Sequence, residues 1–327
     1  MTDILLTTLV LLSAVALLLI SGKLIVRSIS VLARSFRVSE YVISFVLLAF
    51  ATSLPELSVG GNAALAGVPE LSLGDIIGTN IVNITLVIGL VAVIGKTTSI
   101  RDYQHFKNNR LYQLTTVLAP LILLLDGVLS RIDAGILLLL FVWSMVRLLD
   151  IDDKILGRKI LRPHLASHAA AAAVTGSRIL LYVGVLLVGI AGLLFSTHTI
   201  IDIAESLATL AGISQILIGI LIIATLTSLP ELTIGVRSAL KGKGGVTLGD
   251  VFGSATINST LVLGVVALIQ PIHIADTAFL IIAIITTIVI FSLVFLFLHT
   301  KQSLSRSEGS ILIVCFFLFV LAQIWWV

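Results

Sequence analysis

Charged residues are scarce in this sequence, and cysteine is nearly absent. Only 11% of the 327 residues are charged, 58% are apolar, and the mean hydropathy is +1.19. These values exclude a soluble globular protein. The single cysteine, Cys315, excludes an intramolecular disulfide and a CxxC metal or redox site. No basic stretch is interleaved with aromatic residues, so no nucleic-acid partner is expected. The long apolar runs instead predict an all-α integral membrane protein.

We predict ten membrane-spanning helices, because a bilayer core needs about 20 mostly apolar residues per helix. The predicted spans run over Ile4 to Ile25, Val42 to Ala66, Leu73 to Ile94, Leu114 to Leu129, Ile132 to Leu149, Ile179 to Ser196, Ile216 to Leu240, Leu248 to Ile269, Ala278 to Leu298 and Ile311 to Trp326. The first span has Asp3 before it and Lys23 and Arg27 after it, which is the reverse of a signal peptide. We therefore expect it to remain in the mature protein.

The basic residues predict the orientation of these spans. Counted along alternating loops, 19 of the 20 Lys and Arg residues fall on one side, and only Arg131 falls on the other. The positive side is cytoplasmic by the positive-inside rule. We therefore expect a multi-pass protein of the plasma membrane with both termini outside the cell.

The chain contains an internal repeat. Residues 52–57 (TSLPEL) recur as residues 227–232, and 19 of the 38 positions from Thr52 to Gly89 are identical at this offset of 175. Each copy would contain five spans, and an odd number of spans inverts the second copy in the membrane. We predict a five-helix repeat over 1–149, a cytoplasmic linker over 150–177 and an inverted five-helix repeat over 178–327. Inverted repeats are typical of transporters that work by alternating access.

Each repeat places a glutamate near the middle of a span. Glu56 and Glu231 lie where an acidic side chain costs at least roughly 2.5 kcal/mol, and no Lys or Arg lies in the centre of any span to neutralise them. Pro55 and Pro230 precede them, and each proline removes an amide donor and frees a backbone carbonyl. Two carboxylates among neutral oxygens suit a hard cation such as Ca²⁺.

Polar side chains also recur in the third span of each repeat. Asn83 and Asn258 lie deep in these spans, with Thr79 and Ser254 one turn earlier on the same face. As a symmetric pair opposite the glutamates, we interpret the asparagines as cation ligands; the alternative is hydrogen bonding that only holds helices together. Asp75 and Asp250 are interpreted as helix caps at the starts of these spans, with attraction of cations at each entrance as the alternative.

The paired motifs T-S-L-P-E and G-[ST]-x-x-x-N resemble those of the prokaryotic sodium/calcium exchangers of the cation/calcium antiporter superfamily, over essentially the whole chain. The resemblance implies Na⁺/Ca²⁺ exchange, with Glu56 and Glu231 as the central ligands. The carbonyls of Thr52 and Thr227 would complete the Ca²⁺ shell. It also implies two flanking sodium sites, one formed by Ala49, Ser53 and Ser254 with Glu231, the other by Ala224, Ser228 and Thr79 with Glu56. Spans 1 and 6 would slide past this core to switch access.

One departure leaves the coupling ion open. Family members commonly carry Asp where Asn258 stands, whereas the calcium/proton antiporter branch has neutral amides at these positions. Two ionised glutamates are neutralised by one Ca²⁺ or by two protons, whereas three Na⁺ would leave a net charge of +1. Ca²⁺/H⁺ antiport is therefore the alternative to Na⁺/Ca²⁺ antiport.

Other classes of protein explain the sequence less well. A cation channel would also place acidic residues in the membrane, but as a ring of equivalent subunits rather than in oppositely oriented repeats. A structural or signalling protein would leave the buried glutamates without a role. We expect no enzymatic activity, no cofactor and no protein partner, with Ca²⁺ and Na⁺ (or H⁺) as the transported ions and the lipid bilayer as the surroundings.

Overall fold

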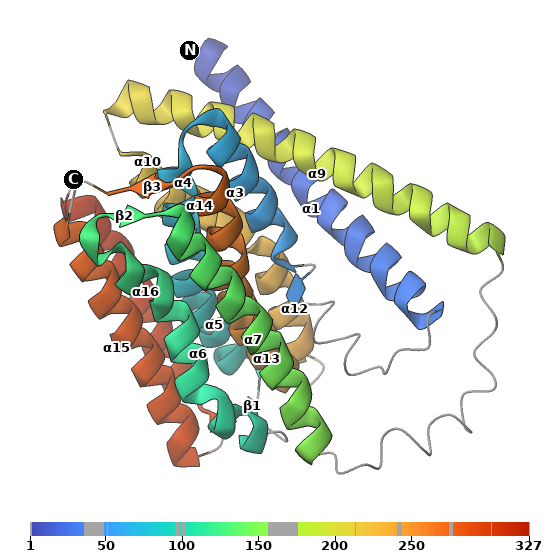
Figure 1. Ribbon diagram of the computed structural model, residues 1–327, viewed down its shortest axis with the longest axis vertical. Coiled ribbons are helices and arrows are strands. Elements are labelled where there is room, and N and C mark those ends of the chain that lie inside the picture. Colours follow the sequence, from blue (N-terminus) through green and yellow to red (C-terminus); the bar gives the residue numbers. More distant parts are fainter. Residues whose placement is uncertain are drawn as a thin grey trace.

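The computed structural model is nearly all-helical (Figure 1) and describes residues 2–35, 49–50, 52–95, 98–99, 103–155, 176–212, 214–240, 244–274, 277–301 and 303–326. The elements before residue 156 are α1 (Thr2–Ser35), α3 (Leu54–Ala66), α4 (Pro69–Val82), η1 (Asn83–Val87), α5 (Ile88–Ile94), β1 (Thr98–Ser99), α6 (Tyr103–Leu123), η2 (Leu124–Asp126), β2 (Val128–Leu129) and α7 (Arg131–Ile155). Those after residue 175 are α9 (Gly176–Ala211), α10 (Gln215–Ile218), η3 (Gly219–Ile223), α11 (Ala224–Thr227), α12 (Leu229–Leu240), α13 (Gly244–Ile257), η4 (Asn258–Val262), α14 (Leu263–Ile269), β3 (Ile272–His273), α15 (Thr277–Lys301), β4 (Ser303–Leu304) and α16 (Arg306–Trp326).

Seven of these helical segments are long and apolar enough to cross a membrane. They are Leu6–Ile25, Pro69–Ile94, Ile179–Ala204, Gln215–Arg237, Thr247–Ile269, Ile281–His299 and Arg306–Gln323, and each coincides with a predicted span. Of the three other predicted spans, the one at 42–66 falls partly outside the described residues. The one at 114–129 corresponds to a shorter apolar helix, Tyr112–Asp126, and the one at 132–149 lies within α7. The chain is a multi-pass membrane protein.

Helix boundaries repeat along the chain with the same offset as the sequence motifs. The starts of α3, α4, η1 and α5 each recur 175 residues later as the starts of α12, α13, η4 and α14. Each of the two short sheets pairs a strand of one half with a strand of the other half. β1 pairs antiparallel with β4, and β2 pairs antiparallel with β3. Thr98 is opposite Leu304 in one sheet, and Val128 is opposite His273 in the other. Each sheet therefore ties a loop of one half to a loop of the other.

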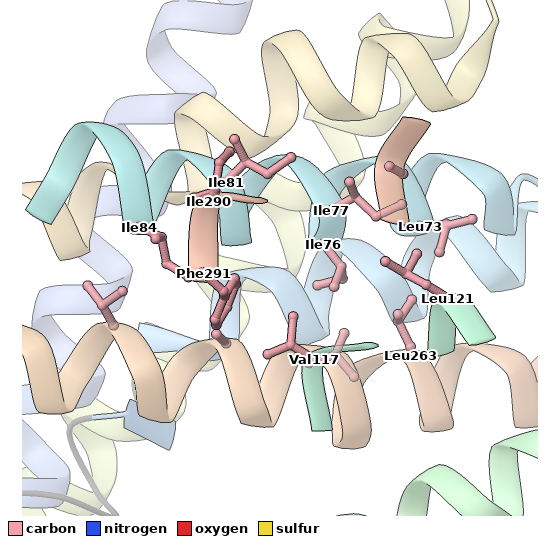
Figure 2. Close-up of a cluster of buried hydrophobic side chains, with 14 of the residues drawn as sticks. Leu73, Ile76, Ile77, Ile81, Ile84, Val117, Leu121, Leu263, Ile290 and Phe291 are labelled. Carbon is pink, nitrogen blue, oxygen red and sulfur yellow. The ribbon is translucent and has the colours of Figure 1, made fainter. Parts of the chain in front are cut away.

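The core lies between the two halves. Leu73, Ile76, Ile77, Ile81 and Ile84 of α4 and η1 are buried, and in Figure 2 their side chains share one cluster with residues of α6, α14 and α15. The labelled residues of those three helices are Val117, Leu121, Leu263, Ile290 and Phe291. Since α4 is buried almost along its whole length, its polar residues are held away from both lipid and water.

Helices α1 and α9 pack against each other at one side of the molecule and run in opposite directions (Figure 1). The two helices approach each other closely because glycines of α9 face α1. A Cβ on Gly189 would meet Ile25, and a Cβ on Gly192 would meet the hydroxyl of Ser21. Small residues of this kind allow helix backbones to approach within a membrane. Both helices extend beyond the predicted spans, to Ser35 and Ala211.

A polar contact fastens α9 to α3. The hydroxyl of Thr197 lies 2.8 Å from the Ser58 hydroxyl and accepts a hydrogen bond from the Asn62 amide at 2.9 Å. At the position in α1 that corresponds to Thr197 by the repeat stands Gly22, where a Cβ would meet nothing within 4 Å. The contact that Thr197 makes in α9 therefore has no equivalent at Gly22 in α1.

We expect Thr197→Val to lower the free energy of unfolding by about 1 kcal/mol, because two interhelical bonds in a membrane protein are each worth about 0.6 kcal/mol. Thermal unfolding of the purified protein in detergent measures the change. The control is Thr199→Val on the same helix, since the Thr199 hydroxyl bonds back to the Phe195 carbonyl. Equal unfolding temperatures for the two variants would contradict a stabilising role for the Thr197 contact.

Candidate cation site

The helix that carries each glutamate is interrupted at the repeated motif, as the prolines predict. In the second copy, α11 ends at Thr227, Ser228 forms a turn, and α12 begins at Leu229. Ser228 has φ −75° and ψ −4°, and Ser53 in the first copy has φ −83° and ψ 0°, so ψ is far from its helical value at both positions. A proline in the first turn needs no amide partner. The break therefore places a new helix start immediately before each glutamate.

Glu56 and Glu231 lie in the first turns of α3 and α12, where the positive end of the helix dipole favours a negative charge. Both side chains are fully buried, and none of their four carboxylate oxygens has a hydrogen-bond partner among the described residues. No lysine or arginine is among the buried side chains that the structure describes. Two buried acidic groups without partners are a costly arrangement that a bound cation would relieve.

Hydrogen bonds between the halves surround the glutamates. The Thr52 hydroxyl lies 2.9 Å from the Ser254 hydroxyl, and the Thr79 hydroxyl lies 3.1 Å from the Thr227 hydroxyl. These two contacts are equivalent by the repeat. The hydroxyls of Ser53 and Ser228 are buried without a partner among the described residues. All the residues predicted to bind ions are buried: Ala49, Thr52, Ser53, Glu56, Thr79, Asn83, Ala224, Thr227, Ser228, Glu231, Ser254 and Asn258.

The interpretation of Asp75 and Asp250 as helix caps is wrong. Helix α4 begins at Pro69 and α13 at Gly244, so both aspartates lie inside their helices rather than at the ends. Both are buried, and they accept hydrogen bonds from the threonines of the opposite half, Asp75 from Thr227 at 3.1 Å and Asp250 from Thr52 at 3.3 Å. The sequence did contain a signal: both aspartates recur at the offset of the glutamates. The predicted starts of these spans, Leu73 and Leu248, lie four residues after the observed helix starts.

Asn83 and Asn258 are the first residues of the π-helical segments η1 and η4. Such segments within α-helices are frequent at functional sites. Both amide groups are fully buried, and neither has a hydrogen-bond partner among the described residues. The alternative interpretation, in which the asparagines only hold helices together by hydrogen bonds, is therefore not supported by any such bond among the described residues. A contact that the sequence did not indicate joins the Asn80 amide to the Ser259 hydroxyl at 2.9 Å.

The centre offers carboxylate, hydroxyl and amide oxygens, which are ligands for hard cations. Across the described residues, no three His, Cys, Asp or Glu side chains come together as a metal-binding group. A cation at this centre would therefore be held by few carboxylates and completed by neutral oxygens. Acidic groups inside membrane-spanning helices, facing the interior between two related halves, define a membrane transporter of cations.

Comparison with known proteins identifies the family. The family model described as sodium/calcium exchanger protein matches residues 6–149 and 181–325, and the chain belongs to this family. The putative antiporter CaxA of Alkalimonas amylolytica is 30% identical over 326 residues, which cover 95% of this chain and 97% of CaxA. The sodium/calcium exchanger MaX1 of Methanosarcina acetivorans is 25% identical, with 95% and 97% covered. The resemblance stated from the motifs is thereby confirmed.

The fold is also similar to solved structures. A structure of the sodium-calcium exchanger NCX_Mj, soaked with 10 mM Na⁺ and zero Ca²⁺, matches with a TM-score of 0.65 and 26% sequence identity, covering 96% of this chain and 97% of that one. Another, soaked with 100 mM Na⁺ and 10 mM Sr²⁺, matches with a TM-score of 0.64.

Proposed function

We propose that this protein is an antiporter that exchanges Na⁺ for Ca²⁺ across the plasma membrane by alternating access. The observation that carries the proposal is the pair Glu56 and Glu231, buried at equivalent helix starts in the two halves with no hydrogen-bond partner in the part of the chain that the structure describes. Membership of the sodium/calcium exchanger family supports it. The protein is then neither an enzyme nor dependent on a cofactor, and Ca²⁺ and Na⁺ are its substrates.

Glu56 and Glu231 are the central ligands in this proposal, and the backbone carbonyls of Thr52 and Thr227 complete the Ca²⁺ shell. One flanking sodium site contains Ala49, Ser53 and Ser254 with Glu231, and the other contains Ala224, Ser228 and Thr79 with Glu56. Asn83 and Asn258 supply further amide oxygens. Two cross-half contacts support this grouping, Thr52 with Ser254 and Thr79 with Thr227, because each joins members of the proposed set.

The proposed architecture is ten spans in two inverted repeats, 1–149 and 178–327, joined by a cytoplasmic linker at 150–177. Two observations agree with an inverted repeat: α1 and α9 run in opposite directions, and each short sheet pairs strands from different halves. The distribution of basic residues puts both termini outside the cell. Sliding of α1 and α9 past the other helices would open the centre to each side in turn.

Ca²⁺/H⁺ antiport is the second candidate, and the pair of neutral amides favours it. Neither Asn83 nor Asn258 carries a charge, so the two glutamates are the only acidic groups among the ligands named above. Two protons would neutralise the glutamates as one Ca²⁺ does, and the exchange would move no net charge. Exchange of three Na⁺ for one Ca²⁺ moves one net positive charge.

Reconstitution into liposomes distinguishes the two couplings. We expect uptake of radiolabelled Ca²⁺ when an outward Na⁺ gradient is imposed, and we expect the rate to respond to membrane voltage set with K⁺ and valinomycin. The parallel experiment imposes a pH gradient in Na⁺-free buffer. Uptake driven by the pH gradient alone would replace Na⁺ coupling by H⁺ coupling. Uptake down the Ca²⁺ gradient without either counter-ion would indicate a channel.

A further inference from the structure

Two aspartates that the proposed ligand sets do not use lie within the same polar centre. Asp75 of α4 accepts hydrogen bonds from Thr79 at 3.3 Å and from Thr227 at 3.1 Å, both through Oδ1. Asp250 of α13 accepts a bond from Thr52 at 3.3 Å, also through Oδ1. Each aspartate therefore contacts the threonine of the TSLPE motif in the opposite half.

The second oxygen of each carboxylate is the unexplained group. Asp75 Oδ2 and Asp250 Oδ2 are buried and have no hydrogen-bond partner among the described residues, and the side chains are 0% and 4% exposed. A buried polar atom left unpaired costs about 1–3 kcal/mol, and more when it is charged. Among the described residues, no buried lysine or arginine is available to compensate either aspartate.

The arrangement occurs twice. The offset of 175 relates Asp75 to Asp250, Thr79 to Ser254 and Thr227 to Thr52, and in each copy the motif threonine lies between the aspartate and the hydroxyl one turn after it. The threonines that contact the aspartates stand four residues before Glu56 and Glu231 in the repeated motif, so the two arrangements adjoin the glutamate centre. An accidental burial of one aspartate would not be repeated with the same partners in the other half.

We propose that Asp75 and Asp250 are direct ligands of monovalent cations, one in each flanking site, an inference that rests on the sodium/calcium antiport proposed above. Asp75 Oδ2 faces the same ion as the hydroxyl oxygens of Thr79 and Thr227, and Asp250 Oδ2 the same ion as those of Thr52 and Ser254. One carboxylate among neutral oxygens balances a single positive charge. Ca²⁺, which takes six to eight oxygens, is better served by the two glutamates.

The charge of the centre changes accordingly. With four carboxylates instead of two, each flanking Na⁺ has its own counter-charge and no longer depends on a glutamate alone. Release of a flanking Na⁺ then leaves an uncompensated aspartate, which the next Na⁺ neutralises. The aspartates therefore set the affinity for Na⁺ more than the affinity for Ca²⁺.

The test compares Asp75→Asn and Asp250→Asn with the unmodified protein in two titrations. Na⁺ is titrated by its effect on thermal unfolding in Ca²⁺-free buffer, and Ca²⁺ is titrated by calorimetry in Na⁺-free buffer. We expect each variant to raise the Na⁺ midpoint by about 10-fold or more, as loss of a charged ligand does, and to raise the Ca²⁺ dissociation constant by a smaller factor.

The comparison separates direct binding from a merely electrostatic role. If the aspartates acted only through their charge at a distance, Ca²⁺ would lose twice the interaction energy that Na⁺ loses, because the energy is proportional to the charge of the ion. A Ca²⁺ affinity that falls as much as, or more than, the Na⁺ affinity would therefore overturn the proposal. Unchanged Na⁺ affinity would overturn it as well.

A second measurement does not depend on the folding of the aspartate variants. In Glu56→Gln/Glu231→Gln, Asp75 and Asp250 remain, and we expect Na⁺ still to stabilise this protein against thermal unfolding relative to N-methyl-D-glucamine. Absence of any such stabilisation would overturn the proposal. The same double variant also tests the proposed function separately. If it still bound Ca²⁺, the glutamates would not be the Ca²⁺ ligands, and the Na⁺ titrations of the aspartate variants could still be interpreted.

Discussion

Glu56→Gln and Glu231→Gln are each expected to abolish Ca²⁺ transport and to weaken Ca²⁺ binding by at least roughly 100-fold. Unit charges 4 Å apart interact by about 4 kcal/mol at an effective dielectric constant of 20, and the interaction with a divalent ion is twice as large. Even if the easier desolvation of glutamine offsets half of this, the remaining roughly 4 kcal/mol exceeds the approximately 2.7 kcal/mol that corresponds to 100-fold. Glutamine keeps the size of the side chain, so the change is mainly in charge.

The measurement is Na⁺-driven Ca²⁺ uptake into liposomes, with Ca²⁺ binding measured by calorimetry. The matched control is Glu70→Gln, which makes the same chemical change in the first turn of α4 at a half-buried position. We expect this control to transport like the unmodified protein. Normal transport by both motif variants would remove the basis of the proposed function.

Local sequence patterns predicted the position of most helices and the interruption at the motif. Apolar windows identified the seven segments that are long enough to cross a membrane. Pro55 and Pro230 predicted an interruption of helical bonding within the motif, and the structure places it at Ser53 and Ser228. Both signals act over a few residues, through hydropathy and through the missing amide of proline. The family resemblance followed from the same short motifs, because they recur at matching positions in both halves.

Contacts across the halves could not be predicted from such patterns. Asp75 precedes an apolar run after a glycine, which resembles a helix start, yet its burial is decided by Thr227, which lies 152 residues away. The π-helical turns at Asn83 and Asn258 likewise arise in the packed bundle, because their sequences contain no residue that requires them. The repeat did indicate which polar residues matter, because Asp75 and Asp250 occur at equivalent positions of the two copies. A polar residue within a membrane helix needs a partner or an ion.

The motif threonines link the two acidic pairs. A threonine hydroxyl has one proton, so Thr227 donates either to Asp75 or to the Ala224 carbonyl, while its oxygen can accept from Thr79. When it donates to the aspartate, its lone pairs remain free for a cation or for Thr79. The aspartates thereby orient the residues that flank the glutamates.

Gly74→Ala is expected to destabilise the protein and to reduce transport, because Gly74 packs directly against the backbone of the other half. A Cβ on Gly74 would overlap the backbone carbonyl of Ile216 in α10, and in the opposite direction a Cβ on Gly219 would overlap the backbone of Leu71. Backbone atoms cannot move aside as the end of a side chain can. Helix α4 would have to shift away from α10 and η3, and Asp75 and Thr79 would shift with it, away from Thr227.

Overpacking of this kind typically costs about 1–3 kcal/mol of stability, and transport should fall by roughly tenfold or more because a site must be held within about 0.5 Å of its working geometry. Thermal unfolding in detergent and Na⁺-driven Ca²⁺ uptake measure the two effects. The control is Gly61→Ala in α3, where a Cβ would meet nothing within 4 Å. That variant should be as stable as the unmodified protein or more stable by about 0.5–1 kcal/mol, as alanine usually is in a helix. Equal stability and transport for the two alanine variants would mean that α4 and α10 are not in close contact, and the cross-half hydrogen bonds of Thr79 and Asp75 would lose their support.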